Sequence, residues 1–267
     1  MPQPQKPEQN ARDQIDAMLT AAGWQLQNID QVNLSPRGVA VREYPTTVGF
    51  VDYMLFVDRK PVGVIEAKPE GTSPSGVETQ SDAYLRSTAK HIPIDKQSLT
   101  FGYISTGTET HFYDVRDPDC RPRPVFAFHR PETLADWLSL TTTLRGRLRT
   151  LPPLIKDKLR DCQIRAIEGL EKSFANNRPR ALIQMATGSG KSFCAVNFVY
   201  RLIKYAGAKR VLFLVDRNTL GRQARTEFQQ FQTPDDHRKF TELYNIQLLS
   251  SSTLDPVCKV TISMHKD

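Results

Sequence analysis

The chain has 267 residues, of which 39% are hydrophobic and 24% are charged. At about 100 to 200 residues per domain, this length allows one or two domains with their own cores, and it excludes a disulfide-held peptide and a long multidomain machine. Lys and Arg outnumber Asp and Glu by 36 to 29, which gives a formal net charge of +7. A basic balance of this size is compatible with phosphate-containing partners but does not establish them.

The four cysteines form no Cys-x-x-Cys pair and have no histidine cluster beside them. We therefore expect neither a zinc site nor a disulfide framework, which favours a reduced environment. The longest apolar runs, such as 211–215, are far shorter than the ~18 to 20 residues that a membrane-spanning helix needs. The first ten residues contain no apolar signal core. The sequence thus predicts a cytoplasmic protein without a membrane segment.

The first part of the chain is predicted to hold a helix and then a hairpin. Residues 1–9 are rich in proline and glutamine and are expected to be disordered. Apolar residues then recur at helical spacing over 11–22, and Gly23 ends the pattern. Two apolar runs, 48–57 and 62–68, flank a turn cluster, so we expect a β-hairpin there.

A capping-box pattern at residues 75–78, Ser-Gly-Val-Glu, predicts the start of a second helix. In such a box the serine hydroxyl and the glutamate carboxylate satisfy free backbone donors at the helix start. Gln80 and Tyr84 would then share one face of this helix, because they are four residues apart. Strands are expected to follow near 99–105 and 111–114.

A proline-rich change of pattern near residue 150 predicts two domains, 1–150 and 151–267. The segment that precedes and spans this change, 116–160, holds ten basic and five acidic residues and so supplies +5 of the net charge. After it, strands alternate with helices at the spacing of parallel winding, so the predicted fold class is α/β. The expected strands are 181–185, 210–215 and 259–263, and the expected helices are 162–174, 191–205 and 219–231.

Residues 185–192, Met-Ala-Thr-Gly-Ser-Gly-Lys-Ser, lie between an expected strand and an expected helix. This is the setting of a phosphate-binding loop, in which backbone N–H groups and a helix N-terminus surround a phosphate. Lys191 would contact the β- and γ-phosphates of ATP, and the Ser192 hydroxyl would bind its Mg²⁺. Met185 replaces the first glycine of the usual pattern. The predicted nucleotide-binding residues of this loop are Thr187, Gly188, Ser189, Gly190, Lys191 and Ser192.

This loop, together with the stretch Leu-Arg-Asp-Cys-Gln at 159–163 and the run that begins at Val211, resembles the opening of a superfamily two helicase or translocase motor. The resemblance implies that Gln163 reads the adenine of ATP. It also places Arg217 and Gln223 in the first DNA-contacting motif of such motors. From the residues alone, a glutamine such as Gln163 is more often simply solvated, and Arg217 and Gln223 are equally compatible with an exposed helix face.

Asp52, Glu66 and Lys68 form a second group of candidate residues, on the predicted hairpin. Successive side chains of a strand alternate between faces, so Val62, Val64, Glu66 and Lys68 would share one face. A pairing in which the residue numbers sum to 118 places Asp52 opposite Glu66, and a sum of 120 places it opposite Lys68. A loop of three or five residues, respectively, would give these registers. Directly opposed Cβ atoms lie ~5 Å apart.

Two carboxylates at this separation repel each other unless a cation lies between them, so they suit a hard divalent metal such as Mg²⁺. The metal would polarise a scissile phosphate and lower the pKa of a bound water. Lys68 could orient that water or stabilise developing charge. Metal-assisted phosphodiester hydrolysis is therefore the predicted chemistry, although an acid on one strand and Glu-x-Lys on another also occur together by chance.

The arrangement resembles the PD-(D/E)xK nuclease superfamily, with Asp52, Glu66 and Lys68 at the motif positions. The resemblance implies that the Ala67 carbonyl is a further metal ligand. Gln80 and Tyr84 then match an extra Gln-x-x-x-Tyr motif of RecB-like nucleases and type I restriction subunits. Some relatives have another acidic ligand where Glu8 stands here, and a solvated glutamate is the ordinary alternative.

A nuclease domain followed directly by a motor resembles the N-terminal part of the restriction (R, motor) subunit of type I restriction-modification enzymes. Such subunits cleave double-stranded DNA after ATP-driven translocation, in complexes with modification and specificity subunits. The resemblance implies a PD-(D/E)xK domain followed by an incomplete RecA-like domain, with Mg²⁺ and ATP as cofactors. The Asp-Glu pair that such motors carry on a later strand is not in the sequence, so we expect weak ATP binding without useful hydrolysis.

Two alternatives stay open from the sequence. The chain could belong to a superfamily two motor whose first domain only binds DNA. It could also be a non-enzymatic module that docks on DNA or on partner subunits.

Overall fold

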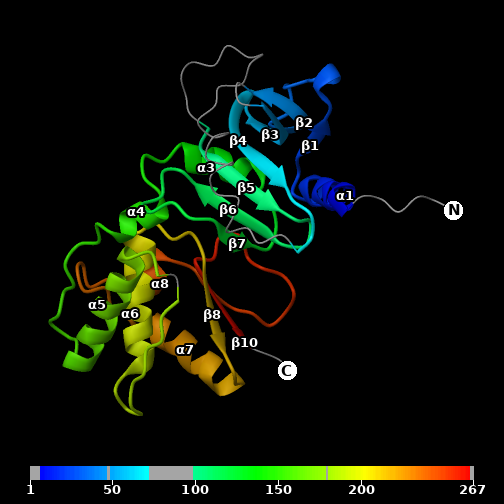
Figure 1. Ribbon diagram of the computed structural model, residues 1–267. Helices are drawn as coiled ribbons and strands as arrows, with labels where there is room; N and C mark the ends of the chain where they lie inside the picture. Colours follow the sequence, from blue (N-terminus) through cyan, green and yellow to red (C-terminus); the bar gives the residue numbers. More distant parts are fainter. Residues whose placement is uncertain (1–6, 47–48, 72–98, 179, 265–267) are drawn as a thin grey trace. The chain divides into compact units, whose positions relative to one another are not determined.

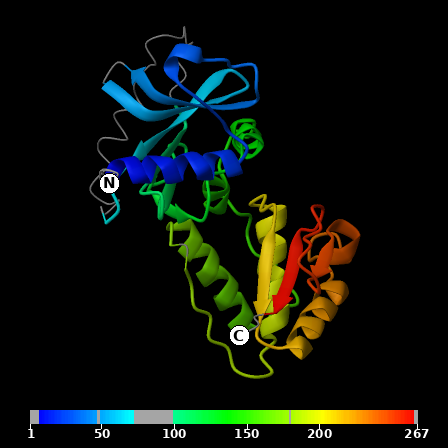
Figure 2. The same cartoon turned by 90° about the vertical axis from the view of Figure 1, so that its right-hand side faces the viewer.

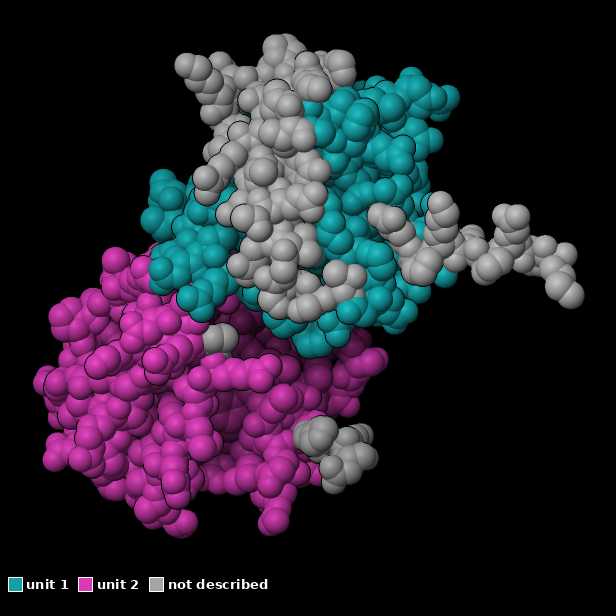
Figure 3. Space-filling view, viewed as in Figure 1, with its two compact units in different colours: residues 1–143 teal, residues 144–267 magenta. Residues whose placement is uncertain are grey.

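The computed structural model describes residues 7–46, 49–71, 99–178 and 180–264, and the side chains from residue 9 onward. The chain divides into two compact units, Met1–Thr143 and Leu144–Asp267, which Figure 3 shows in different colours. The division falls earlier in the chain than the boundary predicted at residue 150. Each unit is of the α/β class, as predicted.

Unit 1 contains a seven-stranded mixed sheet in the order β1-β2-β3-β4-β5-β6-β7, which follows the order of the chain (Figure 1). β1 is parallel to β2, β4 is parallel to β5, and the other neighbours are antiparallel. The strands are β1 (Gln25–Gln27), β2 (Gly38–Thr46), β3 (Gly49–Val57), β4 (Lys60–Ala67), β5 (Phe101–Ser105), β6 (Thr110–Asp114) and β7 (Arg123–Val125). The described part of unit 1 also contains helix α1 (Pro7–Ala21), a short 3-10 helix, η1 (Ile29–Gln31), and helix α3 (Pro131–Leu138).

The predicted first helix is confirmed as α1 (Pro7–Ala21). Its side chains at helical spacing, Ile15 and Leu19, are fully buried against the sheet. Gly23 adopts a left-handed φ of 89° directly after the helix, where a residue without Cβ is favoured. Residues 7–9, which we expected to be disordered, lie in the helix. Proline at the first helical position accounts for this, because its fixed φ suits a helix start and its missing N–H has no partner there.

The apolar side chains of unit 1 form two clusters. The first contains α1, α3 and residues of the strands, including Leu55, Ile65 and Phe101. Figure 2 shows α1 running along the sheet, where it contacts β1 and β4. The second cluster contains Met54, Val64 and other strand residues. Both sides of the central strands are therefore buried, which explains why β3 and β4 have nearly continuous apolar sequences.

His129 lies among the aromatic rings of the first cluster. Its Nδ1 is 2.7 Å from the Tyr103 hydroxyl, its carbonyl accepts the indole N–H of Trp24, and its ring lies 4.7 Å from that of Trp137. Burial lowers the pKa of His129 to about 4, and the charge of Arg123 acts in the same direction. The imidazole is therefore neutral in the folded chain at pH 5, where an unfolded imidazole is protonated.

We expect unit 1 to lose stability as the pH falls from 6.5 towards 4, because only the unfolded state gains a proton in that window. The expected loss from this group is about 2 kcal/mol at pH 5. Both tryptophans of the chain, Trp24 and Trp137, are in unit 1, so urea unfolding followed by tryptophan fluorescence at pH 7.5 and pH 5 measures it. His129→Gln should flatten the dependence, and equal losses in both proteins would contradict this account.

The predicted hairpin is confirmed as β3 and β4. Asp58 and Arg59 form a two-residue turn with left-handed φ values of 47° and 69°, as a tight hairpin turn with the twist of a sheet requires. The register shifts between Leu55 and Phe56, and the pairs beyond it, Tyr53↔Ile65 among them, sum to 118. A two-residue turn plus a β-bulge therefore gives the register for which we expected a three-residue loop. The bulge also explains why Val62 packs with Ile65, on the face opposite to the predicted one.

Unit 2 contains a parallel sheet in the order β8-β10-β9, and Figure 2 shows β8 and β10 side by side. Five of the six predicted elements are confirmed within a residue or two of their expected ends. Residues 181–186 are the exception, because they form no strand and Leu182 is 94% exposed. The elements are α4 (Leu144–Leu148), α5 (Asp161–Ala175), α6 (Lys191–Lys204), β8 (Val211–Val215), α7 (Asn218–Gln230), α8 (Phe240–Leu243), β9 (Ile246–Leu248) and β10 (Val260–Met264).

The core of unit 2 lies on one face of its sheet. Val260 and Ile262 of β10 pack with apolar residues of α6 and α7. On β8 the alternate residues Leu212 and Leu214 point away from this core and are each 61% exposed. Within the described ranges, each helix is too short or too polar to cross a membrane.

Arg201 of α6 joins this helix to α5 and to the segment that precedes α5. The side chain is 4% exposed, and its guanidinium donates to both carboxylate oxygens of Glu171 at 2.5 and 3.1 Å. It also donates to the carbonyl of Pro152 at 2.5 Å. One buried cation thus satisfies one carboxylate and a carbonyl of the connecting segment.

Several arginines of the predicted basic segment donate hydrogen bonds within the chain. Arg116 donates to Asp114, and Arg123 donates to Asp117. In and after α4, the guanidinium of Arg147 donates to the carbonyl of Ala206 at 2.7 Å, just past the end of α6. The side chain of Arg149 donates to the carbonyl of Ala175 at 3.0 Å, the last residue of α5. Cations at these positions suit the negative ends of helix dipoles.

Candidate functional site

The three predicted nuclease residues lie together at one end of the β3–β4 hairpin. The paired part of the hairpin ends at Tyr53↔Ile65, and Asp52 and Glu66 are the next residues on the two strands. The Asp52 Oδ2 accepts the backbone N–H of Ala67 at 2.8 Å, and the Lys68 Nζ donates to Glu66 Oε1 at 2.8 Å. The side chains are 12% exposed for Asp52 and 11% for Glu66. The geometry thus brings two carboxylates and one ammonium into a nearly buried group.

Glu66 is held in an environment that disfavours its charge. Burial raises the pKa of the Glu66 carboxyl, and the negative charge of Asp52 contributes to the rise. The hydrogen bond from Lys68 acts in the opposite direction. A cation between the carboxylates would remove the repulsion, and this is the electrostatic setting of a metal-binding pair.

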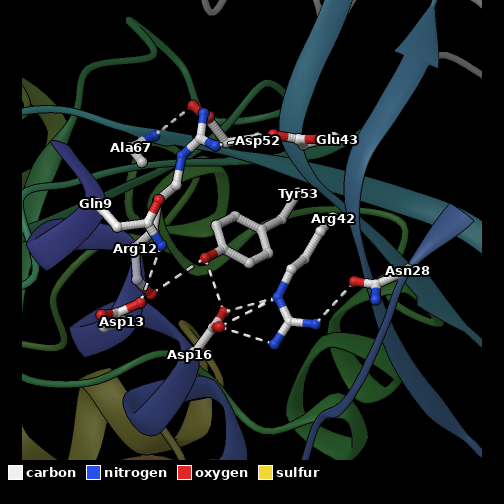
Figure 4. A network of polar contacts seen from close by, with 10 residues as sticks. All are labelled: Gln9, Arg12, Asp13, Asp16, Asn28, Arg42, Glu43, Asp52, Tyr53 and Ala67. Atoms are coloured by element: carbon white, nitrogen blue, oxygen red, sulfur yellow. Dashed lines mark hydrogen bonds and ion pairs between the residues drawn. The ribbon is translucent and has the colours of Figure 1, made fainter.

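Two further charged residues, Arg12 and Glu43, complete this group, and the sequence analysis did not find them. The pairs Arg42↔Tyr53 and Tyr44↔Val51 flank Glu43 and Asp52, which therefore face each other across β2 and β3. Arg12 reaches from α1, and its guanidinium contacts Asp52 Oδ1 at 2.6 Å and Glu43 Oε1 at 2.9 Å (Figure 4). Three carboxylates thus lie in a row across three neighbouring strands, with Arg12 between the first two.

Helix α1 is fixed beside this row by a second polar network (Figure 4). Asp16 accepts hydrogen bonds from Arg42 at 2.7 Å and from the Tyr53 hydroxyl at 2.8 Å. Arg42 also donates to the side chain of Asn28 at 3.1 Å. The two networks line a pocket of about 270 Å³ whose other walls include Gln9 and Ile29.

The donor set of this site fits Mg²⁺. Among the described residues there is no cluster of three or more His, Cys, Asp or Glu side chains arranged to hold a metal. Mg²⁺, however, commonly takes only one or two protein carboxylates and keeps several waters. Asp52 and Glu66 provide two such hard oxygen donors. Of the other predicted residues, Gln80 and Tyr84 lie outside the described residues, and so does the side chain of Glu8, which belongs to α1.

The predicted phosphate loop leads into α6 in unit 2. Gly188 and Gly190 both have left-handed φ values, 78° and 79°, and Lys191 is the first residue of the helix. The Lys191 Nζ donates to the carbonyls of Met185 and Ala186 at 3.3 and 3.2 Å, so it folds back over the loop. Ser192 lies in the first turn of α6 and is half-buried, and Thr187 is exposed.

Gln163 packs against the phosphate loop from α5. It is 3% exposed, and its Oε1 accepts the backbone N–H of Arg160 at 3.0 Å. Its Nε2 donates to the carbonyls of Ser189 and Gly190 at 3.0 and 3.3 Å. The amide group therefore contacts the loop and does not face solvent on the helix surface. Its predicted role in reading adenine stays a prediction.

Arg217 and Gln223, the candidate DNA-contacting residues, are both exposed. Arg217 precedes α7 and is 79% exposed, and Gln223 lies on the helix. Exposure at both positions is compatible with a DNA contact and with an ordinary exposed helix face.

Comparison with known families gives two matches. Residues 156–264 match the type III restriction enzyme res subunit family, ResIII. Residues 32–102 match the family described as the second domain of the type I restriction enzyme EcoKI endonuclease subunit. The first match contains the phosphate loop, and the second contains Asp52, Glu66 and Lys68.

Individual relatives of the chain include endonuclease subunits of type I restriction enzymes. The chain is 28% identical to the type I restriction enzyme EcoKI endonuclease subunit of Escherichia coli K12, over 96% of this chain and 26% of that protein. It is 32% identical to the EcoAI endonuclease subunit of Escherichia coli, over 39% of this chain and 12% of that protein. A solved fragment of a proposed HsdR subunit from Vibrio vulnificus YJ016 covers 97% of this chain and 47% of that chain, with 19% identity and a TM-score of 0.38.

The chain thus spans about a quarter of the length of the EcoKI subunit. Its matches to the second-domain family and to the ResIII family occur in the same order as the two units of the structure. The chain is therefore an HsdR-like relative of the endonuclease subunits of type I restriction enzymes, with a second-domain region followed by a ResIII region.

Proposed function

We propose that this chain is part of the restriction subunit of a type I restriction-modification system, in which unit 1 cleaves double-stranded DNA and unit 2 binds ATP for translocation. Unit 1 would be a PD-(D/E)xK nuclease domain, and unit 2 would belong to a RecA-like motor domain. The observation that supports this most is the nearly buried group of Asp52, Glu66 and Lys68, within the region that matches the EcoKI family.

In this proposal, Asp52, Glu66 and the Ala67 carbonyl would hold Mg²⁺. When bound, the ion would polarise the scissile phosphate and lower the pKa of a water. The N–H of Ala67 fixes the orientation of the Asp52 carboxylate before any ion arrives. Lys68, 2.8 Å from Glu66, would orient the attacking water or stabilise negative charge on the phosphate. The described chain thus supplies both acids and the cationic group of the reaction.

In unit 2, the backbone N–H groups of residues 187–190 would surround the phosphates of ATP. Lys191 would exchange its two carbonyl contacts for phosphate oxygens, and Ser192 would bind the Mg²⁺ of the nucleotide. The Gln163 amide would stabilise the conformation of the loop through its hydrogen bonds to the carbonyls of Ser189 and Gly190. Double-stranded DNA and the modification and specificity subunits are the proposed partners.

The cleavage proposal is tested by incubating the chain with supercoiled plasmid DNA and Mg²⁺ or Mn²⁺, alone and with its modification and specificity subunits. Nicked and linear products that disappear with EDTA are expected. DNA binding without any metal-dependent cleavage, in the presence of the partner subunits, would instead favour a DNA-binding or docking role for unit 1.

Lys191→Ala is expected to weaken the binding of a fluorescent ATP analogue at least about tenfold, because a cation that faces the phosphates is lost. Titration of the analogue in the presence of Mg²⁺ measures the change. Lys172→Ala removes an exposed lysine from the last turn of α5 and is the matched control. Equal affinities for both variants would contradict the role of Lys191.

A further inference from the structure

The guanidinium of Arg12 contacts Asp52, one of the two carboxylates that would hold the divalent ion in the proposed function. Its Nη2 contacts Asp52 Oδ1 at 2.6 Å, while Ala67 N–H takes the other oxygen, Oδ2, at 2.8 Å. Both carboxylate oxygens of Asp52 therefore already have a donor from the chain itself. Such a short charge-assisted contact is among the stronger ones that an aspartate makes.

We propose that Arg12 is a gate for the divalent metal: its guanidinium is an internal counter-cation of Asp52 that must move aside before the ion binds. This inference rests on the proposed nuclease function and adds a regulatory residue to its site. It makes metal loading depend on Arg12, and through Arg12 on the position of α1.

The charge of the group supports competition. Glu43, Asp52 and Glu66 carry three negative charges, and Arg12 and Lys68 carry two positive charges. A divalent ion that enters beside Arg12 meets a nearly neutral group and a like charge at close range. Once Arg12 turns from Asp52 to Glu43, the like charge is withdrawn from the ion and the Asp52 carboxylate can bind it.

The contacts of Arg12 allow it to move without unfolding the helix. Its guanidinium already touches Glu43, whose side chain is 67% exposed, so a resting place away from Asp52 is in reach at 2.9 Å. The Nε of Arg12 is buried and has no hydrogen-bond partner among the described residues, so the side chain is held only at its tip. Glu43 has a left-handed φ of 48° although the register continues on both sides of it, a conformation that a residue with Cβ adopts at some cost.

The competing explanation is a purely structural role, in which Arg12 only holds α1 against the sheet. However, α1 is also attached to the sheet independently of Arg12, because Asp16 accepts hydrogen bonds from Arg42 and Tyr53. The two roles predict opposite effects on metal affinity. If Arg12 only supports the structure of the site, its removal would weaken metal binding. If Arg12 is a gate, its removal would strengthen metal binding.

The test compares Mn²⁺ binding to the full chain and its variants by isothermal titration calorimetry. Arg12→Gln is expected to lower the Kd at least about tenfold, because it removes a like charge within a few ångströms of the ion. Arg37→Gln removes the same charge from an exposed ion pair of unit 1 and should leave the Kd unchanged. Asp52→Asn should abolish the binding.

Arg12→Lys provides a second variant in case Arg12→Gln does not fold. Lysine keeps the charge but cannot donate to both carboxylates as a planar fork, so the Kd should fall in the same direction by a smaller factor. Tryptophan fluorescence melts of unit 1 give a readout without catalysis: the rise in Tm on adding Mn²⁺ should be larger for Arg12→Gln than for the wild type.

The outcomes separate the two proposals. If Asp52→Asn abolishes Mn²⁺ binding while Arg12→Gln binds no tighter than the wild type, the gate is refuted and the nuclease site stands. If neither the wild type nor Arg12→Gln binds Mn²⁺ above the level of Asp52→Asn, both proposals fail.

Discussion

Replacement of Glu66 by glutamine is expected to abolish metal-dependent DNA cleavage without unfolding unit 1. Loss of one of two carboxylate ligands should reduce the cleavage rate at least about 100-fold, in the range of other essential groups of hydrolytic sites. Burial and Asp52 raise the pKa of Glu66, so its negative charge is costly in the folded chain at neutral pH. A neutral isostere removes that cost, and the Tm of unit 1 should stay the same or rise.

Glu70→Gln is the matched control for this variant, because it makes the same change at an exposed residue four positions away. Lys68→Met and Lys60→Met form a second pair, since Lys60 is exposed at the other end of β4. Plasmid cleavage with Mg²⁺ and tryptophan fluorescence melts are measured for all four. Full cleavage by Glu66→Gln, or a loss that accompanies unfolding, would contradict a catalytic role for this carboxylate.

Arg201→Met is expected to destabilise unit 2 by about 3 to 5 kcal/mol, because it leaves the mostly buried carboxylate of Glu171 and the carbonyl of Pro152 without their cation. Hydrogen exchange should accelerate in α5 and α6, which this residue joins. Exchange followed by mass spectrometry resolves these helices.

The double variant Arg201→Met with Glu171→Leu should recover much of the loss, since no charge is then left unpaired. Arg165→Met, at an exposed position of α5, is the control. Unchanged exchange in α5 and α6 of Arg201→Met would show that this ion pair contributes little to unit 2.

Local patterns in the sequence predicted most of the helices and strands. Helical spacing gave α1, and the two apolar runs with the turn between them gave the β3–β4 hairpin. The observed register, in which paired residue numbers sum to 118, was one of the two predicted registers. The sequence could not choose between them, because the choice depends on a bulge at Leu55 and Phe56 that absorbs one residue.

The rest of the site depends on contacts between segments that are distant in the chain. Arg12 reaches Asp52 only because α1 is fixed across the sheet by Asp16, and no spacing in the sequence encodes that placement. Glu43 is found only after the pairing of β2 with β3 is known. The expected strand at 181–185 is a different case. Its apolar residues resemble a buried strand, but none of the strands β8, β9 and β10 of the described sheet pairs with it.

The arginines around α4 determine where the two units can be separated. Arg147 and Arg149 close the ends of α6 and α5, although both lie before residue 150. A fragment that starts at residue 151 would therefore lose both helix-end contacts, and a fragment that ends at residue 150 would separate Arg147 and Arg149 from these two acceptors. Dissection between Thr143 and Leu144 keeps donors and acceptors in the same piece.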